Sequence, residues 1–469
     1  MKLALAVLAL SSLWLAPRHS GAPRPSHRGS RKPSYGGVAT AWRLRERDGA
    51  LPLGRLATRW WGCTPLRVAA PTPGSVLVVG PTQSGKTTSL CVPMVLRWEG
   101  PVLAASVKPD LARLTSEGRA ARGRVQLVDP GGAGDAVFDP VALATSYAAA
   151  RAIARDLTVG TGAGHGAGEH EFWGSLAAKL LAPLLLAAHR VDGSIATVSC
   201  WVDRHDAATA LGVLEGHEDE AADALAASLA RDDRTLSAVL ATVEAALDPL
   251  VAGEDVVDPE ALLDGPNTCY LAAPVHDQRR FRPLFVGLVR QVLAAAARRD
   301  GGAGLLVLLD EAASIAPLDE LDEIAATCQG QGVTLVTVWQ DLAQLVARYG
   351  PRARTVVNNH TSRVLLGGLA DPTLGEWLPT LTGPASETTG RTGAAPLSPE
   401  QLRQWPRGAA VLVAGRHPPL RLRLSARPGS LAPHSLRSRR GRPVGSPLSR
   451  RSRAASPRKV RCRGGDLER

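Results

Sequence analysis

The strongest constraint on the fold is a glycine-rich octet, GPTQSGKT at residues 80–87, which matches the pattern G-x-x-x-x-G-K-[ST]. An apolar run, SVLVV at residues 75–79, precedes it, and a stretch of helical character runs from Thr87 to Leu96. In this strand–loop–helix order the glycines let backbone N–H groups turn inward, and the helix N-terminus adds its positive dipole end. The octet therefore predicts a loop that binds the phosphates of a nucleotide.

The residue types of the octet suit a nucleoside triphosphate with a metal ion. Lys86 is expected to reach the β- and γ-phosphates, and the Thr87 hydroxyl is expected to ligate Mg²⁺. We therefore predict ATP and Mg²⁺ as cofactors. The residues expected to bind the nucleotide are Gly80, Pro81, Thr82, Gln83, Ser84, Gly85, Lys86, Thr87 and Thr88.

Hydrolysis needs further groups, and two later strand ends supply candidates. The run LLVLLD at residues 305–310 ends in Asp310 and is followed by Glu311. Asp310 is expected to hold Mg²⁺ through a water, and Glu311 to polarise the attacking water. Gln340 follows the apolar run 333–339. Since strand ends line the ligand crevice of an open α/β sheet, Gln340 is expected to contact the γ-phosphate or the attacking water.

Strand patterns alternate with helical ones, which predicts an α/β fold with a mostly parallel central sheet. A closing pair, residues 409–413 and 420–424, is predicted as an antiparallel hairpin at the sheet edge. Ala-rich helical periodicity dominates residues 141–255 and predicts an inserted all-α domain. Besides 75–79, the predicted parallel strands are residues 102–106, 125–128, 268–274, 305–310, 333–339 and 362–366.

The formal net charge of +12 is unevenly distributed. Residues 426–469 hold 13 Lys/Arg against 2 Asp/Glu, and residues 17–48 hold 8 against 2. We interpret these segments as a disordered basic tail and a basic linker. Such segments bind DNA or anionic lipid without sequence preference, or they are solvated and bind nothing. The six scattered cysteines include no C-x-x-C pair, which favours neither a disulfide framework nor a zinc site.

The N-terminus carries an apolar run at residues 3–16. As a helix it would span about 21 Å, less than the hydrocarbon core of a bilayer. Residues 1–16 are therefore interpreted as a short anchor or a truncated membrane helix. A secretory signal peptide is the other interpretation, although export of a nucleotide-binding domain makes little sense.

Longer segments resemble the coupling-protein ATPases of type IV secretion and conjugation, the TraG/TraD-like family. The resemblance is sharpest in EAASIAPL at residues 311–318 and QGVTLVTVWQDLAQL at residues 331–345. It covers residues 50–425. Further segments that fall in the order typical of that family are SVKPD at 106–110, DP at 129–130, FW at 172–173, NNH at 358–360 and LSPEQL at 397–402.

This resemblance implies a RecA-like motor domain formed by residues 49–140 and 256–425, interrupted by the all-α insertion at 141–255. It implies a DNA-translocating ATPase at the cytoplasmic face of the inner (plasma) membrane, assembled as a homo-hexamer. The implied partners are DNA without sequence preference, a relaxase and components of the type IV secretion channel. By this resemblance, nucleotide binding is assigned to Gly80, Gly85, Lys86 and Thr87. The roles of the acidic pair are assigned to Asp310 and Glu311, and the sensor role to Gln340.

One departure leaves other functions open. Members of the family often carry an arginine, supplied to the neighbouring subunit, where this chain has Gln329. Arg348, Arg352 and Arg354 are the candidate substitutes. A non-hydrolysing adaptor that binds nucleotide and recruits secretion substrates is therefore one alternative. A DNA translocase of the FtsK or HerA kind is another.

Overall fold

The computed structural model describes residues 38–47, 49–57, 66–132, 134–158, 167–273, 276–302, 304–382 and 397–424. The predicted anchor at residues 1–16, most of the predicted linker and the basic tail at 426–469 lie outside the described residues. The predictions made for them stay predictions.

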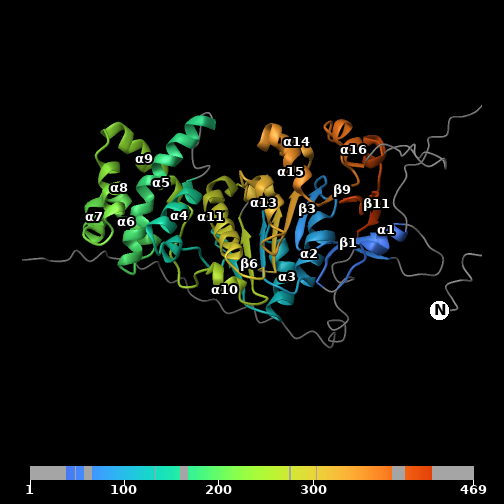
Figure 1. Cartoon of the computed structure of the whole chain (residues 1–469), viewed down its shortest axis with the longest axis horizontal. Coiled ribbons are helices and arrows are strands. Elements are labelled where there is room, and N and C mark those ends of the chain that lie inside the picture. The colour runs from blue at the N-terminus through green and yellow to red at the C-terminus, as the bar shows by residue number, and fades with distance from the viewer. Residues whose placement is uncertain are drawn as a thin grey trace, which may run out of the picture.

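A single 11-stranded sheet runs through the middle of the molecule, in the order β2-β1-β11-β10-β9-β3-β8-β7-β4-β6-β5 (Figure 1). Its seven strands from β9 to β5 are parallel. The predicted α/β fold with a mostly parallel sheet is confirmed. The strands are β1 Leu51–Leu56, β2 Arg67–Ala70, β3 Gly74–Val79, β4 Val102–Ser106, β5 Val125–Val128, β6 Thr268–Ala272, β7 Leu305–Asp310, β8 Val333–Trp339, β9 Ser362–Leu366, β10 Ala409–Ala414 and β11 Leu420–Arg423.

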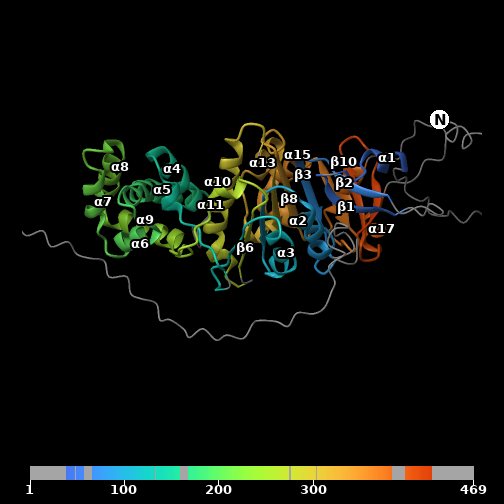
Figure 2. The same cartoon turned by 90° about the horizontal axis from the view of Figure 1, so that it is seen from below.

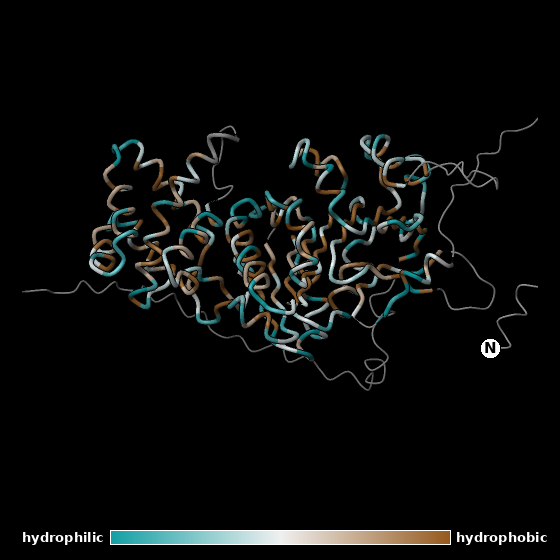
Figure 3. Tube along the Cα trace, viewed as in Figure 1, coloured by the Kyte–Doolittle hydropathy of each residue, from teal (hydrophilic) through white to brown (hydrophobic). Residues whose placement is uncertain are grey.

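The central strands are apolar on both faces because helices cover both faces of the sheet. In β3, Leu77 and Val79 face one core while Val76 and Val78 face the other. The tube in Figure 3 shows this concentration of hydrophobic residues along the strands. Helices α1 to α3 pack on one face, and α11 to α15 cover the other. Their bounds are α1 Val38–Arg43, α2 Val92–Arg97, α3 Asp110–Ala120, α11 Gln278–Ala297, α12 Ala312–Ile315, α13 Leu321–Thr327, α14 Leu342–Tyr349 and α15 Ala353–Asn359.

The sheet differs from the prediction at its antiparallel end. β10 and β11 form the predicted antiparallel pair, but they do not lie at the edge. β11 also pairs with β1, and β1 pairs with β2, so two strands from the start of the domain lie beyond the hairpin. The edge position was wrong because β1 and β2 were not recognised as strands. Helix α1 likewise packs Ala41 into the core, although residues 17–48 were predicted as a linker.

Between β5 and β6 the described chain forms helices and one isolated bridge, Val137 to Val256. The helices between residues 147 and 247 lie together at the end of the molecule opposite β1 and β2, as Figure 2 shows from below. The boundaries 141 and 255 of the proposed insertion stay a prediction. The helices are η2 Pro140–Leu143, α4 Tyr147–Thr158, α5 Ala167–Arg190, α6 Ile195–Asp203, α7 Ala207–Leu214, α8 Asp219–Leu229, α9 Asp233–Leu247 and α10 Pro259–Leu263.

Helix α5 is the central helix of this all-α region. It packs against α4, α7, α8 and α9. Within the described residues, its stretch Phe172–Arg190 is the one helical segment long and apolar enough to span a membrane, and most of it is buried inside the protein. Its apolar character is accounted for by this core position. The remaining described helices are η1 Thr87–Cys91, η3 Gly350–Arg352, α16 Leu374–Thr382 and α17 Pro399–Arg403. Helix α16 lies toward the antiparallel end (Figure 1).

Candidate functional site

The candidate site lies at the carboxyl edge of the parallel strands, where β3, β8, β7 and β4 end side by side. The register pairs Val79 of β3 with Trp339 of β8. It also pairs Asp310 of β7 with Val338 of β8 and with Ser106 of β4. The glycine-rich loop, the acidic pair and Gln340 therefore follow neighbouring strands. This is the edge of an open α/β sheet at which ligands bind.

The start of the glycine-rich loop follows β3 and is hydrogen-bonded to the end of β8. The Gly80 N–H donates to the Trp339 carbonyl at 3.1 Å, which holds the start of the loop beside Gln340. A Cβ at position 80 would lie 2.9 Å from the Leu366 Cβ, so the loop needs glycine there. Gly85 has φ +95°, a conformation that L side chains rarely adopt. Both glycines of the motif are thus required by the backbone path.

The Lys86 side chain is buried inside this loop. Its ammonium donates to the Pro81 carbonyl at 3.0 Å and to the Gly80 carbonyl. Burial lowers the pKa of Lys86, and the charges of Asp310 and Glu311 oppose that shift. The loop therefore surrounds a cation whose neighbours are mainly its own carbonyl groups, an environment that an anionic ligand would stabilise.

Asp310 at the end of β7 accepts hydrogen bonds from the glycine-rich loop and from β4. The Thr87 hydroxyl donates to Asp310 Oδ2 at 2.8 Å, and the Ser106 hydroxyl donates to the same oxygen at 3.3 Å. Burial raises the pKa of Asp310, while the hydrogen bond from Thr87 opposes the shift. Ser106 was missing from the predicted site. Its signals in the sequence are its place at a strand end and the family-like segment SVKPD at 106–110, and its relevance appears once the register sets it beside Asp310.

Glu311 and Gln340 follow β7 and β8 directly. Glu311 is half-buried and has φ +63°, a strained left-handed conformation for a residue with a side chain. It precedes α12, and its carbonyl accepts from the Ser314 N–H at 2.8 Å. The Gln340 N–H donates to Gln344 Oε1 at 3.1 Å at the start of α14. Each residue is held by its backbone at the point where a strand turns into a helix.

The remaining predicted loop residues also lie at this edge. Thr82, Gln83 and Thr88 are exposed, and Pro81 is half-buried. The Ser84 side chain is buried, and its hydroxyl has no hydrogen-bond partner among the described residues. A buried hydroxyl without a partner is costly and is a natural contact for a polar ligand.

These observations fit a nucleoside triphosphate with Mg²⁺. The orphaned Ser84 hydroxyl and the Lys86 ammonium offer donors to phosphate oxygens. The Thr87 hydroxyl and Asp310 carboxylate offer the hard oxygen ligands that Mg²⁺ takes. A cation at Asp310 would also favour its ionised form, which burial alone disfavours.

The three candidate arginines are each engaged within their own chain. Arg348 pairs with Asp319 and donates to the Pro317 carbonyl at 3.0 Å. The other two pairs are Arg352 with Asp322 and Arg354 with Glu376. These contacts do not single out one of the three as a group supplied to a neighbouring subunit.

Comparison with known proteins agrees with this geometry. A family model described as "Type IV secretory system Conjugative DNA transfer" matches residues 44–389. Two conjugal transfer proteins TraG from Escherichia coli are 28% and 26% identical over 332 and 336 residues. Each match covers 61% of this chain and 52% of the relative, so the chain spans about half the length of the curated relatives it matches.

Solved structures share the fold. The plasmid coupling protein TrwB in complex with ADP and Mg²⁺ has a TM-score of 0.63 at 20% identity, covering 87% of this chain and 97% of that one. TrwB with a non-hydrolysable GTP analogue gives 0.64 at 20% identity, covering 86% and 96%. VirB4 of Thermoanaerobacter pseudethanolicus gives 0.52 at 12% identity, covering 82% and 98%.

Proposed function

The chain belongs to the type IV secretory system conjugative DNA transfer family, and from this membership we propose that it is a Mg²⁺-dependent ATPase that drives DNA transfer as a coupling protein. The observation that carries the proposal is the 2.8 Å hydrogen bond from Thr87 to Asp310. It joins the glycine-rich loop to the acidic strand end across more than 200 residues of sequence. The residues proposed to bind the phosphates and those proposed for hydrolysis therefore lie close together, which supports the proposal.

Each side chain has a separate task in this proposal. Lys86 and the backbone N–H groups of residues 82–88 bind the phosphates, while Thr87 and Asp310 hold Mg²⁺. When bound, the metal ion neutralises charge on the β- and γ-phosphate oxygens. Glu311 accepts the proton of the attacking water, and Gln340 orients that water or contacts the γ-phosphate. Ser106 keeps the Asp310 carboxylate turned toward Thr87 through its own hydrogen bond.

The proposal extends to partners and location. We propose that the chain acts on DNA without sequence preference and works with a relaxase and the type IV secretion channel. We also propose a homo-hexamer at the cytoplasmic face of the inner membrane. The family description supports the DNA-transfer role, and the uneven charge supports contact with polyanions.

ATP turnover with and without DNA tests the function. Lys86→Ala should lower turnover at least about 100-fold because it removes the charge that binds the transferred phosphate. Glu311→Gln should keep ATP binding and lower turnover about 10²–10⁴-fold. Lys179→Ala, at an exposed lysine of α5, is the matched control and should leave both unchanged.

Two results would contradict the proposal. Turnover that survives both site substitutions would remove the catalytic assignment. Tight ATP binding by the unmodified protein with no turnover, even when assembled on DNA, would instead favour the nucleotide-dependent adaptor. The engagement of Arg348, Arg352 and Arg354 by carboxylates of the same chain is the observation that keeps the adaptor as the second candidate.

A further inference from the structure

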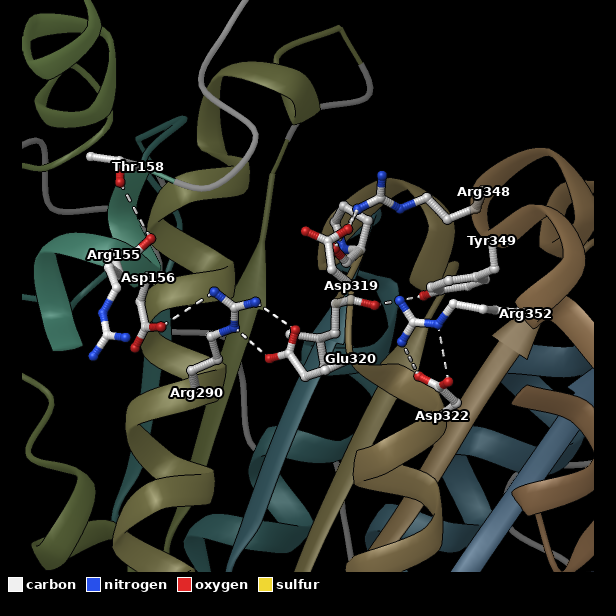
Figure 4. Close-up of polar contacts among 12 residues, drawn as sticks. Arg155, Asp156, Thr158, Arg290, Asp319, Glu320, Asp322, Arg348, Tyr349 and Arg352 are labelled. Carbon is white, nitrogen blue, oxygen red and sulfur yellow. Dashed lines mark hydrogen bonds and ion pairs between the residues drawn. The ribbon is translucent and has the colours of Figure 1, made fainter. Parts of the chain in front are cut away.

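A half-buried arginine connects the all-α region to the segment that follows the acidic pair. Arg290 lies in the middle of α11, and its side chain is 15% exposed. Its Nε and Nη2 donate to the two carboxylate oxygens of Glu320 at 2.7 and 2.6 Å, and its Nη1 donates to Asp156 Oδ1 at 3.2 Å. Figure 4 shows the guanidinium lying between the two carboxylates. One side chain thus contacts two residues, Asp156 and Glu320, that lie more than 160 positions apart in the sequence.

The two carboxylates belong to different parts of the molecule. Asp156 lies near the end of α4, within the all-α region, and its Oδ2 accepts from Gln291 Nε2 at 2.9 Å. Glu320 is the last residue before α13. It ends the β7–α13 connection, defined here as residues 311–320. Glu311 is the first residue of this connection, so Arg290 holds one end of it and the catalytic candidate stands at the other.

The β7–α13 connection is held on its second side by α14. The Tyr349 hydroxyl donates to the Leu318 carbonyl at 2.8 Å, and Arg348 pairs with Asp319. Figure 4 shows Arg348, Tyr349 and Asp319 of this contact region. Helix α14 begins directly after Gln340 and Asp341. The connection therefore has two contacts. It contacts α14, the helix that follows the predicted sensor residue Gln340, and it contacts the all-α region through Arg290.

The ion pairs around Arg290 are not explained by stability alone. Asp156 faces Arg290 and Gln291 of α11 and Glu320 of the connection. Burial raises the pKa of Asp156 to about 6, because the loss of solvation outweighs the attraction of Arg290. The three side chains are 15–32% exposed, and the cost of desolvating charges at such a junction offsets much of their attraction. A role in positioning is the simpler reason for three charges at this junction.

We propose that Arg290 is a positioning residue that couples the nucleotide site to the all-α region, by holding the β7–α13 connection through Glu320 and the end of α4 through Asp156. This inference rests on the proposed nucleotide binding. When the nucleotide site changes state, a movement of Glu311 and its connection is passed to α4 through the guanidinium. Removing either carboxylate arm should interrupt that response without emptying the nucleotide site.

The test measures hydrogen exchange of α4, residues 147–158, in the full chain with and without a non-hydrolysable ATP analogue and Mg²⁺. In the unmodified protein the analogue should change the exchange rate of α4 amides at least twofold. In Arg290→Gln, Asp156→Asn and Glu320→Gln this change should disappear. The analogue's affinity should stay within twofold in all three, and protection of the glycine-rich loop should persist.

Arg280→Gln is the matched control. Arg280 also joins α11 to the all-α region, through Asp248, but that pair is exposed and lies on a different turn of the helix. The α4 response should survive this substitution. Since Asp156→Asn conserves shape, it serves if Arg290→Gln fails to fold.

The outcomes separate this inference from the proposed function. An α4 response that persists in Asp156→Asn or Arg290→Gln overturns the coupling role, as does analogue binding by the unmodified protein without any α4 response. Loss of the response in Arg280→Gln as well would show a general loosening of the junction and would also overturn it. Failure of the unmodified protein to bind the analogue overturns the proposed function itself.

Discussion

At the scale of single residues, the two buried charges of the candidate site are each displaced toward their neutral forms. Burial lowers the pKa of Lys86 and raises that of Asp310. A triphosphate supplies the opposite charge for the lysine, and a divalent cation supplies it for the carboxylate. The protein therefore holds two unfavourable charges that its proposed ligands would stabilise. Because the nucleotide acts on Lys86 and the metal ion on Asp310, the two kinds of binding can be measured separately.

The Thr87 hydroxyl gives the first prediction. Thr87→Val keeps the shape of the side chain but removes the oxygen that contacts Asp310. We expect ATP affinity to fall about tenfold in the presence of Mg²⁺ and to change little in the presence of a chelator, because only the metal-dependent contact is lost. Equilibrium nucleotide titrations under the two conditions measure this.

The exposed neighbour Thr88 is the control for that prediction, and Thr88→Val should leave both affinities near those of the unmodified protein. An equal loss of affinity with and without Mg²⁺ would show that Thr87 contacts the nucleotide and not the metal.

Asp156 gives a prediction about pH. Its folded pKa of about 6 lies above the ordinary value of 3.8, so the folded chain keeps this proton at pH values where the unfolded chain has lost it. The free energy of unfolding should therefore fall as pH rises from about 4 to 6, by about 1–3 kcal/mol from this group. Asp156→Asn lacks that contribution.

Thermal unfolding of both proteins at pH 4.5 and 7.5 measures the difference. The unmodified protein should lose stability relative to Asp156→Asn on going to the higher pH. A relative gain at pH 7.5 would mean that Arg290 stabilises the carboxylate more than burial penalises it.

At the scale of elements, the β7–α13 connection gives a stability prediction. Tyr349→Phe removes the hydroxyl that donates to the Leu318 carbonyl and leaves that carbonyl without its partner. The free energy of unfolding should fall by about 1–2 kcal/mol, as for other buried hydrogen bonds that lose one partner. Urea unfolding measures it. Tyr147→Phe, on α4 beside Arg151, is the control and should cost less, and equal losses would speak against a specific anchor.

The parallel strands could be predicted because each is a continuous apolar run with both faces buried, as in β7 and β8. β1 could not, since Pro52 and Gly54 interrupt its pattern and mark a shift in register with β2. The predicted antiparallel pair β10–β11 is confirmed, but its position at the sheet edge was wrong for the same reason, because its outer neighbour β1 lies more than 350 positions earlier in the chain. Local pattern carries no information about such a partner.

The residues of the candidate site also divide into those that local sequence could predict and those that it could not. The glycine-rich loop and Asp310 could be predicted because their residue spacing is set by the ligand. Ser106 and Arg290 could not, because a serine at a strand end and an arginine in a helix are ordinary residues until the fold places them against Asp310 and Glu320. The predicted catalytic roles themselves stay predictions.

At the scale of the whole molecule, charge is divided between regions. Residues 141–255 hold 7 Lys/Arg against 17 Asp/Glu, although the whole chain has a net charge of +12. A DNA backbone is repelled by such a surplus of carboxylates. The all-α region is therefore a poor candidate for direct contact with DNA phosphates, and the basic segments outside it are better ones.

Deletion of residues 426–469 tests this distribution. These residues hold 13 Lys/Arg, and each phosphate contact that they make adds to the salt dependence of binding. The shortened protein should bind DNA more weakly, with a smaller slope of log affinity against log salt, while its ATP affinity is unchanged. Fluorescence anisotropy at several salt concentrations measures both. An unchanged slope would show that the tail does not contact DNA.

The position of β11 has a consequence for synthesis on the ribosome. β11 separates β1 from β10, so β1 reaches the rest of the sheet through a strand that is translated more than 350 residues later. The β1–β2 pair stays unpaired on one side until β11 has emerged from the ribosome. The antiparallel end of the sheet is thus completed only after β11 is translated. A nascent chain that stalls before residue 420 exposes an unpaired strand edge to other protein chains.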